Sequence, residues 1–310
     1  MSAVRIVVSG GTGVIGRCAV PALVAAGHDV AVLTRRPEGA KLAGQLGASP
    51  VAGDLFDVDS LARAYDGADA IVNLASRMPT GYEVVRRRAW RHHDALRTVG
   101  VANVVAAART AGVRRIVQDS GSFLYADNGD DWITEQNALE ITPATEPLAV
   151  AEAHVQDYSC DSRAGVILRL GWIVGDDAMT RYRLRGAAHG RAVGLGRPES
   201  WTHLVHTDDL GSAVVASLHA PSGVYNVGAE PVQKQDMVAV YAAAVGADSL
   251  AFVGPVLRRL AGARLEPMSR SLRVCSDHFA AQTGWAPSRP KFDISWLDAA
   301  RADVGTAPQR

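Results

Sequence analysis

Residues 4–16 read Val-Arg-Ile-Val-Val-Ser-Gly-Gly-Thr-Gly-Val-Ile-Gly, a β-branched run that leads directly into clustered glycines. The spacing satisfies Gly-x-Gly-x-x-Gly through Gly11, Gly13 and Gly16, and Gly-x-x-Gly-x-x-Gly when Gly10 is counted first. A turn without side chains lets main-chain N–H groups and the positive end of the next helix approach a pyrophosphate. The following stretch is apolar with helical spacing, so strand, turn and helix occur in the order that the motif requires. We therefore predict a nucleotide phosphate site here; the alternative is a tight turn without a ligand.

The bulk composition excludes several classes of protein. The 310 residues are enough for one large domain or two smaller ones. Lysine and arginine together number 32, as do aspartate and glutamate, so the net charge does not favour nucleic acid or an anionic membrane. No apolar run is long enough to span a bilayer, and the start lacks the pattern of a signal peptide. Cys18, Cys160 and Cys275 are widely spaced, so we expect reduced thiols in a cytoplasmic protein, with Cys18 buried on the first helix.

Apolar runs alternate with amphipathic stretches along the first half of the chain. This alternation predicts an α/β fold, a Rossmann-type doubly wound parallel sheet with helices on both faces. The expected strands are 4–9, 29–34, 50–53, 70–75, 116–120, 166–170, 202–206 and 225–227. The expected helices are 14–26, 38–46, 60–65, 147–163, 208–219 and a long one over 83–111.

After Gly175 the alternation breaks. We predict a nucleotide-binding core over 1–175, completed by about 202–228. Residues 176–201 and 229–302 would form a smaller substrate-binding lobe, and 303–310 a flexible tail. Ligands of such sheets bind beyond the carboxyl ends of the strands, so the lobe would cover that edge.

The second strand indicates which nucleotide is bound. An acidic residue at its end would hold a ribose 2′-hydroxyl, but Arg35 and Arg36 stand there and Asp29 lies at the opposite end. Two guanidinium groups suit a 2′-phosphate, so NADP(H) is favoured over NAD; the alternative is two solvated arginines. Beyond the third strand, Asp54 would accept from the adenine amine while Leu55 covers the ring.

Several further segments occur in a characteristic order: 53–55, 73–75, 167–175, 206–210, 225–228 and 283–287. Together with the glycine turn, they resemble the extended short-chain dehydrogenase/reductase family of the NAD(P)-dependent epimerase/dehydratase type. The resemblance covers nearly the whole chain and implies a nicotinamide cofactor and a C-terminal substrate lobe. The predicted cofactor-binding residues are Gly10, Thr12, Gly13, Val14, Ile15, Arg35, Arg36, Asp54, Leu55, Leu74, Ala75, Ser76, Gly171 and Ile173.

The chain departs from that family at its catalytic pair. The family places a tyrosine and, four residues later, a lysine on one helix, and here Leu148 and Glu152 occupy those positions. None of the three lysines, Lys41, Lys234 and Lys291, follows a tyrosine by four residues. Ser120 or Ser122 would supply the family's serine, and Arg97 stands where many relatives carry asparagine. Losing a positioned acid costs roughly 10²–10⁴-fold in rate, which an electrophilic substrate can tolerate.

The sequence therefore predicts an NADPH-dependent ketoreductase whose proton comes from water, from Ser120 or Ser122, or from a hydroxyl of the substrate. The chain is loosely similar to divergent ketoreductases that tailor aromatic-polyketide antibiotics, so we expect a small-molecule ketone that is bulky and aromatic. A non-catalytic NADP(H)-binding sensor or scaffold is the alternative. The predicted substrate contacts are Met78, Tyr125, Trp172, Tyr182 and Trp201, with Arg77, Arg181 and His189 available for polar groups.

Two weaker clusters have structural interpretations. His203, His206 and Asp209 resemble a metal-ligand set, but on a strand the two histidines face opposite sides, so we predict no metal and a helix cap. The basic residues over 86–93 indicate a solvated helix face or a homodimer contact through the helix 83–111. Nucleic-acid binding is not expected, since no aromatic platform accompanies them.

Overall fold

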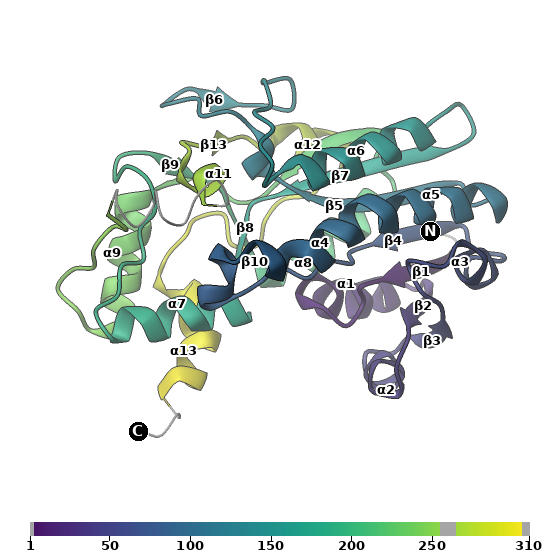
Figure 1. Ribbon diagram of the computed structural model, residues 1–310, viewed down its shortest axis with the longest axis horizontal. Coiled ribbons are helices and arrows are strands. Elements are labelled where there is room, and N and C mark those ends of the chain that lie inside the picture. The colour runs from purple at the N-terminus through teal and green to yellow at the C-terminus, as the bar shows by residue number, and fades with distance from the viewer. Residues whose placement is uncertain (1–2, 255–264, 306–310) are drawn as a thin grey trace.

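The computed structural model describes residues 3–254 and 265–305. Seven parallel strands form one sheet in the order β11-β7-β5-β4-β1-β2-β3 (Figure 1). The register places Val7 beside both Ala31 and Ile71, so β1 lies inside the sheet, between β2 and β4. The strands are β1 Arg5–Ser9, β2 Asp29–Thr34, β3 Ser49–Ala52, β4 Ala70–Asn73, β5 Arg115–Gly121, β7 Ala164–Leu170 and β11 Gly223–Val227. The predicted doubly wound α/β fold is confirmed.

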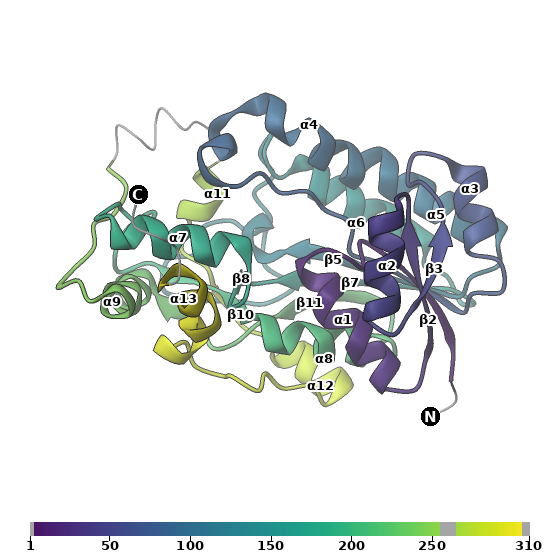
Figure 2. The ribbon, with the colours of Figure 1, turned by 90° about the horizontal axis from the view of Figure 1, so that it is seen from below.

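Helices cover both faces of the sheet, which explains the continuous apolar runs of its strands. One face packs against α1 (Val14–Ala25), α8 (Thr207–Ser217) and α12 (Asp277–Thr283), with α2 (Pro37–Gln45) at its edge. The other face packs against α3 (Val58–Ala64), α5 (Val101–Thr110) and α6 (Glu146–Tyr158). Figure 2 shows these two layers on opposite sides of the strands.

The strand order reverses between β1 and β4. From β1 the chain proceeds outward to β2 and β3, whereas from β4 it proceeds the other way to β5, β7 and β11. The connections that leave β1 and β4 therefore diverge, which opens a crevice beyond their carboxyl ends. This reversal fixes where a ligand can enter.

A second group of elements lies at the end of the molecule opposite β2 and β3 (Figure 1). It contains α7 (Ala178–Ala188), α9 (Lys234–Val245), η5 (Ile294–Leu297) and α13 (Asp298–Gly305). These elements share an apolar cluster that includes Leu184, Tyr241 and Trp296. A two-stranded parallel pair, β8 (Trp172–Val174) and β10 (Leu204–His206), connects this cluster to the sheet.

The structure also contains two short strand pairs and one short helix. β9 (Trp201–Thr202) pairs antiparallel with β12 (Val232–Gln233), and β6 (Trp132–Ile133) pairs parallel with β13 (Arg273–Val274). α11 covers Glu266–Ser269. The expected strand 202–206 is divided in two, because His203 lies between β9 and β10. Of the predicted tail, 303–305 belong to α13 and 306–310 lie outside the described residues.

The predicted long helix over 83–111 is interrupted. It consists of a 3₁₀ turn (η1, Gly81–Val85), α4 (Arg87–Ala95), a π-helical turn (η2, Leu96–Gly100) and α5. The extended backbone of Arg86 separates η1 from α4. The wider π turn carries Arg97, which points inward to a buried carboxylate rather than to solvent. Helical periodicity alone does not show such a turn.

Two further predictions concern the cysteines and membrane-spanning helices. Cys18 is half-buried rather than buried, and Cys18, Cys160 and Cys275 are all free. Across residues 3–254 and 265–305, no helix reaches the combination of length and apolarity that crossing a bilayer requires.

The glycine turn yields a test with a matched control. A methyl group on Gly16 would lie 2.3 Å from the carbonyl oxygen of Gly10, whereas one on Gly44 in α2 would meet nothing within 4 Å. We expect Gly16→Ala to lower the free energy of unfolding by about 1–3 kcal/mol through overpacking. Gly44→Ala should raise it by roughly 0.5–1 kcal/mol, because alanine suits a helix better. Urea unfolding of both variants measures this; effects of the same sign would contradict it.

Candidate active site

A cavity of about 1140 Å³ lies along the carboxyl ends of the sheet and continues to α7. The structure brings every residue predicted to bind the cofactor into its wall, from Gly10 on the first turn to Ile173 on β8. Six loops and strand ends that are distant in sequence thus share one space. The site extends beyond a dinucleotide's expected contacts, since helices α4 and α7 also line it.

The glycine turn has the form that a phosphate group needs. Gly10 adopts a positive φ of 74°, and the N–H of Gly13 donates to its carbonyl oxygen at 2.9 Å. Gly13 is the N-cap of α1 and offers no side-chain cap, so the first amides of that helix lack acceptors within the helix. Gly13, Val14 and Ile15 line the cavity. This end of α1 therefore fits the pyrophosphate of a dinucleotide.

The end of β2 places two arginines at the cavity. Arg35 and Arg36 follow Thr34, the last residue of the strand. Arg35 Nη1 lies 3.7 Å from Asp54 Oδ2, with both side chains roughly half exposed, so this pair is weak and can rearrange. Arg36 is the N-cap of α2, and Pro37 begins that helix. The two guanidinium groups fit a 2′-phosphate.

A buried ion pair lies under the middle of the cavity. Glu152 of α6 accepts from Arg169 of β7 twice, Nε to Oε1 at 3.0 Å and Nη2 to Oε2 at 2.7 Å. Both side chains are 5% exposed or less. Burial by itself would lower the pKa of Arg169, but the hydrogen bonds and charge of Glu152 prevail and raise it. Arg169 also lies over the ring of Tyr125, 4.8 Å from its centroid.

This ion pair determines what Ser120 can do. The Ser120 hydroxyl donates to Glu152 Oε1 at 2.6 Å, and Ser120 lines the cavity. A serine has one proton, so its remaining capacity toward a ligand is that of an acceptor. Leu148, one turn before Glu152 on α6, lines the cavity with an apolar side chain. A lysine at position 152 would face the Arg169 guanidinium, so the glutamate and this arginine belong together.

A second buried ion pair lies at the floor of the cavity. Arg97 of the π turn binds the Asp119 carboxylate at 2.8 and 2.6 Å, and also its carbonyl oxygen at 2.8 Å. Both side chains line the cavity but are almost fully buried. Next to it, Asn73 Nδ2 donates to Gln118 Oε1 at 2.7 Å. The floor is thus polar, paired and without net charge.

The aromatic wall differs in part from the prediction. Met78, Trp172 and Tyr182 line the cavity, and Phe123, which the sequence did not single out, stacks on Trp172 with ring centroids 5.0 Å apart. Trp201 does not line it, because its Nε1 donates to Asp130 at 2.9 Å elsewhere on the surface.

Tyr125 and Ser122 are also corrected. Both are fully buried and outside the cavity wall, and the Tyr125 hydroxyl donates to Asn226 of β11 at 2.8 Å. The reason is the 3₁₀ turn η3 (Ser122–Leu124) after β5. It places Phe123 at the cavity and Ser122 in the interior, whereas Ser120 lies before the turn, on β5. Strand alternation continued past Gly121 does not reveal this turn.

The arginine of α7 that reaches the cavity is not the one that the sequence predicted. Arg181 pairs with Asp176 and His189 contacts the Arg185 carbonyl, and neither lines the cavity. Arg183 does, on the face that also carries Met179, Tyr182 and Gly186. The i, i+3, i+4, i+7 spacing of these four residues is the signal that would have found Arg183.

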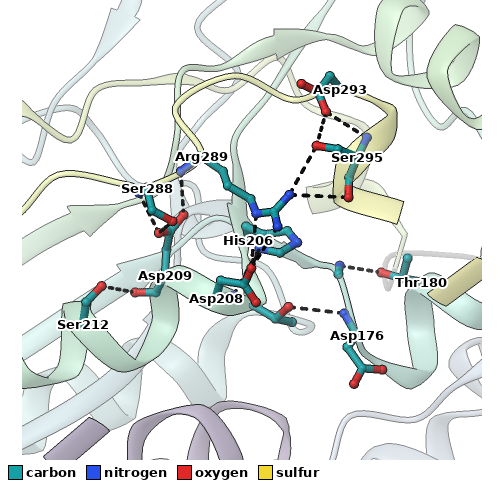
Figure 3. Close-up of polar contacts among 12 residues, drawn as sticks. Asp176, Thr180, His206, Asp208, Asp209, Ser212, Ser288, Arg289, Asp293 and Ser295 are labelled. Atoms are coloured by element: carbon teal, nitrogen blue, oxygen red, sulfur yellow. Dashed lines mark hydrogen bonds and ion pairs between the residues drawn. The ribbon is translucent and has the colours of Figure 1, made fainter. Parts of the chain in front are cut away.

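The cluster of His203, His206 and Asp209 forms a structural junction; Figure 3 shows His206 and Asp209. His206 Nδ1 accepts from the Asp208 N–H at 3.1 Å, which caps α8, and Asp209 accepts from the N–H and hydroxyl of Ser288 at 2.7 and 2.6 Å. Asp208 pairs with Arg289 at 3.1 Å. Burial lowers the pKa of His203 to about 3, so its ring is neutral. Within the described part of the chain, no three potential ligands are placed to hold a metal ion.

Comparison with known proteins agrees with this geometry. The family described as NAD(P)H-binding matches residues 10–221. The chain belongs to this NAD(P)H-binding family of extended short-chain dehydrogenases/reductases. It is 30% identical to a 3-diazoavenalumate denitrifying reductase of a Streptomyces species, over 95% of this chain and 98% of that protein. It is 34% identical to a 4-hydroxy-2-methyl-3-oxo-4-farnesyl-3,4-dihydroquinoline-1-oxide ketoreductase of Stigmatella aurantiaca, over 40% of this chain and 35% of that one.

Solved structures show the same fold. The UDP-glucose 4-epimerase of Thermotoga maritima aligns with a TM-score of 0.77 and 17% identity, covering 97% of this chain and 99% of its own. The short-chain dehydrogenase/reductase described here is an NAD(P)H-dependent oxidoreductase, and its relatives named above include reductases. Leu148 and Glu152 on α6 are the residues that we predict to stand at the positions of the family's tyrosine and lysine.

The buried pair yields the second test. Glu152→Ala leaves the Arg169 guanidinium unpaired in the interior, and breaking one half of a buried pair costs about 3–5 kcal/mol. The control is Arg114→Ala, which breaks the Arg114–Asp69 pair, whose side chains are 74% and 37% exposed. That loss should stay below about 1 kcal/mol. Urea unfolding compares the variants, and similar losses would contradict a structural role for the Glu152–Arg169 pair.

Proposed function

We propose that this protein is an NADPH-dependent reductase that transfers hydride to a carbonyl carbon of a bulky, aromatic, polyketide-like ketone without a tyrosine acid. The observation that carries the proposal is the arrangement at Leu148 and Ser120. An apolar side chain occupies the acid's position, and the neighbouring hydroxyl donates its proton to Glu152. The reductase relatives and the aromatic wall support the same reading.

Bound NADPH supplies a hydride from C4 of its nicotinamide ring. The amides of the glycine turn would bind the pyrophosphate, and Arg35 and Arg36 the 2′-phosphate. Leu148 and the stacked rings of Phe123 and Trp172 exclude water from the centre of the cavity. Ser120, as an acceptor, would orient a hydroxyl of the ligand. These residues position and desolvate the reactants, which is a large part of such catalysis.

The proton comes from the substrate in this scheme. When the carbonyl carbon accepts hydride, its oxygen takes a proton from a hydrogen-bonded phenol on the same molecule, and that phenoxide regains a proton from water. The carbonyl is reduced to an alcohol and NADPH is oxidised to NADP⁺. A phenol hydrogen-bonded to a ketone also makes the ketone more electrophilic, which compensates for the missing acid.

A second candidate follows from the same arrangement. Hydride transfer to the ring carbon of an aryl diazonium ion forms a C–H bond while the C–N bond breaks and N₂ leaves with its electron pair. That step requires no acid at all. The denitrifying reductase that matches 95% of this chain favours testing it. The two candidates differ in the substrate and share the cofactor and the cavity.

The choice of cofactor is testable by binding. We expect the double variant Arg35→Ala/Arg36→Ala to weaken NADPH binding by about 10- to 100-fold, because charge-assisted hydrogen bonds to the 2′-phosphate are lost. NADH binding should hardly change. Lys41→Ala, on the exposed side of α2 and outside the cavity, is the control. Calorimetric titration of both variants with NADPH and with NADH measures these affinities. If the unmodified protein did not bind NADPH more tightly than NADH, the assignment would be refuted.

The reaction is tested with NADPH carrying deuterium at C4. We expect oxidation of the cofactor with 1-hydroxyanthraquinone and little with its methyl ether, which has no phenol to supply the proton. Ser120→Ala should change the rate by less than about tenfold, whereas loss of a true acid costs roughly 10²–10⁴-fold. Tyr182→Phe, a second hydroxyl variant on the wall, should also change the rate by less than about tenfold.

The same assay with a benzenediazonium salt separates the candidates, because deuterium would then appear on the ring carbon; a reaction without enzyme corrects for background. A loss of 10²-fold or more in either hydroxyl variant would identify a protein acid and contradict the scheme. Binding of NADPH without turnover of any of these compounds would favour the sensor alternative.

A further inference from the structure

The end of the cavity farthest from the glycine turn carries unpaired positive charge. Arg183 and Arg191 both line it, and neither forms an ion pair with a carboxylate among residues 3–254 and 265–305. The other arginines that line the cavity lie outside the lobe. Arg97 is paired with Asp119, Arg35 and Arg36 follow β2, and Arg77 follows β4. Arg183 lies near the hydroxyl of Tyr241, a neutral phenol, so no described carboxylate neutralises either lobe arginine.

The register of α7 brings Arg183 to the cavity. Met179, Tyr182, Arg183 and Gly186 lie on one face of the helix, while Arg181 and Arg185 fall on other faces. Arg183 is partly buried and Arg185 is exposed. Arg183 thus lies on the face of α7 that lines the cavity, next to Tyr182.

The turn after α7 brings Arg191 to the same face. Gly190 has a φ of 69°, a left-handed conformation that reverses the chain, and the N–H of Arg191 donates back to the Gly186 carbonyl at 2.9 Å. A methyl group on Gly186 would lie 3.7 Å from Arg191 Cβ and 3.8 Å from its Cδ. The stem of Arg191 therefore lies beside Gly186, which is one turn beyond Arg183 on the same face of α7.

Among the described residues, the one carboxylate on this part of the wall is already engaged. Asp177 caps α7, accepting from the N–H groups of Met179 and Thr180 at 2.8 and 3.0 Å and from the Thr180 hydroxyl at 2.5 Å. Around the arginines the wall is otherwise apolar or aromatic, with Tyr182, Val193, Leu195 and Met268. Two guanidiniums on this part of the wall match a planar oxyanion attached to an apolar body.

We propose that Arg183 and Arg191 bind a carboxylate of the substrate, so that this reductase acts on aromatic acids. The inference rests on the proposed reductase function and adds the anionic group to it. Anchoring the carboxylate at α7 would hold the aromatic body against Tyr182 and Trp172, with its reducible end toward Leu148. A nucleoside diphosphate is the competing ligand of similar charge, and the experiment includes it.

The test is calorimetric titration of the protein preloaded with NADP⁺. The ligands are anthraquinone-2-carboxylate, its methyl ester and UDP. We expect the acid to bind at least about tenfold more tightly than the ester. Arg183→Gln and Arg191→Gln should each weaken binding of the acid by about tenfold and leave binding of the ester unchanged. Arg185→Gln, a change of the same kind on the same helix but outside the cavity, should have no effect.

Equal binding of acid and ester, or an equal effect of Arg185→Gln, would overturn the carboxylate site. Binding of UDP that exceeds that of the acid and depends on Arg183 would replace it with a diphosphate site. Because this readout is binding, a protein that prefers the acid but oxidises no NADPH would contradict the proposed reaction and leave the carboxylate site intact. Oxidation of NADPH without tighter binding of the acid would support the proposed reaction and contradict the carboxylate site.

Discussion

The Glu152–Arg169 pair is the interaction on which the rest of the site depends. It joins α6 to β7 in the interior, receives the proton of Ser120 from β5, and supports the ring of Tyr125, whose hydroxyl binds Asn226 on β11. Three neighbouring strands and a helix thus meet in one closed polar network. Such networks are favourable only when every member is satisfied, because unpaired charge in the interior is costly.

The network has a direct chemical consequence. In the family that this chain resembles, the corresponding helix presents a phenol and an ammonium group to the substrate. Here the same helix presents Leu148 to the cavity and directs its charge inward to Arg169. In the proposed scheme this position supports the fold and takes no part in the chemistry. With the second pair, Arg97–Asp119, the floor is neutral, and in that scheme the rate comes from positioning, desolvation and an electrophilic substrate.

The two halves of the cavity are formed by different groups of elements. Its first half follows from the reversal of strand order between β1 and β4, where the glycine turn and the arginines of β2 lie. Its second half comes from α7 and the chain after it, which belong to a different apolar cluster. A ligand that spans both halves meets main-chain amides at one end and guanidinium groups at the other. Cofactor and substrate specificity can thus vary separately.

The sequence by itself determined the sheet, its helices and the cofactor end of the cavity. Those features depend on local signals: apolar runs, helical spacing, and glycines that must lie close to the strand, as Gly16 lies against Gly10. The prediction that Leu148 and Glu152 stand at the family's tyrosine and lysine positions also came from the sequence. Only the tertiary structure showed that Glu152 pairs with Arg169, that Arg97 turns inward on a π turn, and that Tyr125 and Trp201 leave the cavity while Arg183 enters it. These outcomes depend on the rotation of each element about its own axis, which is fixed by burial against residues far away in the chain, and no local spacing specifies that rotation.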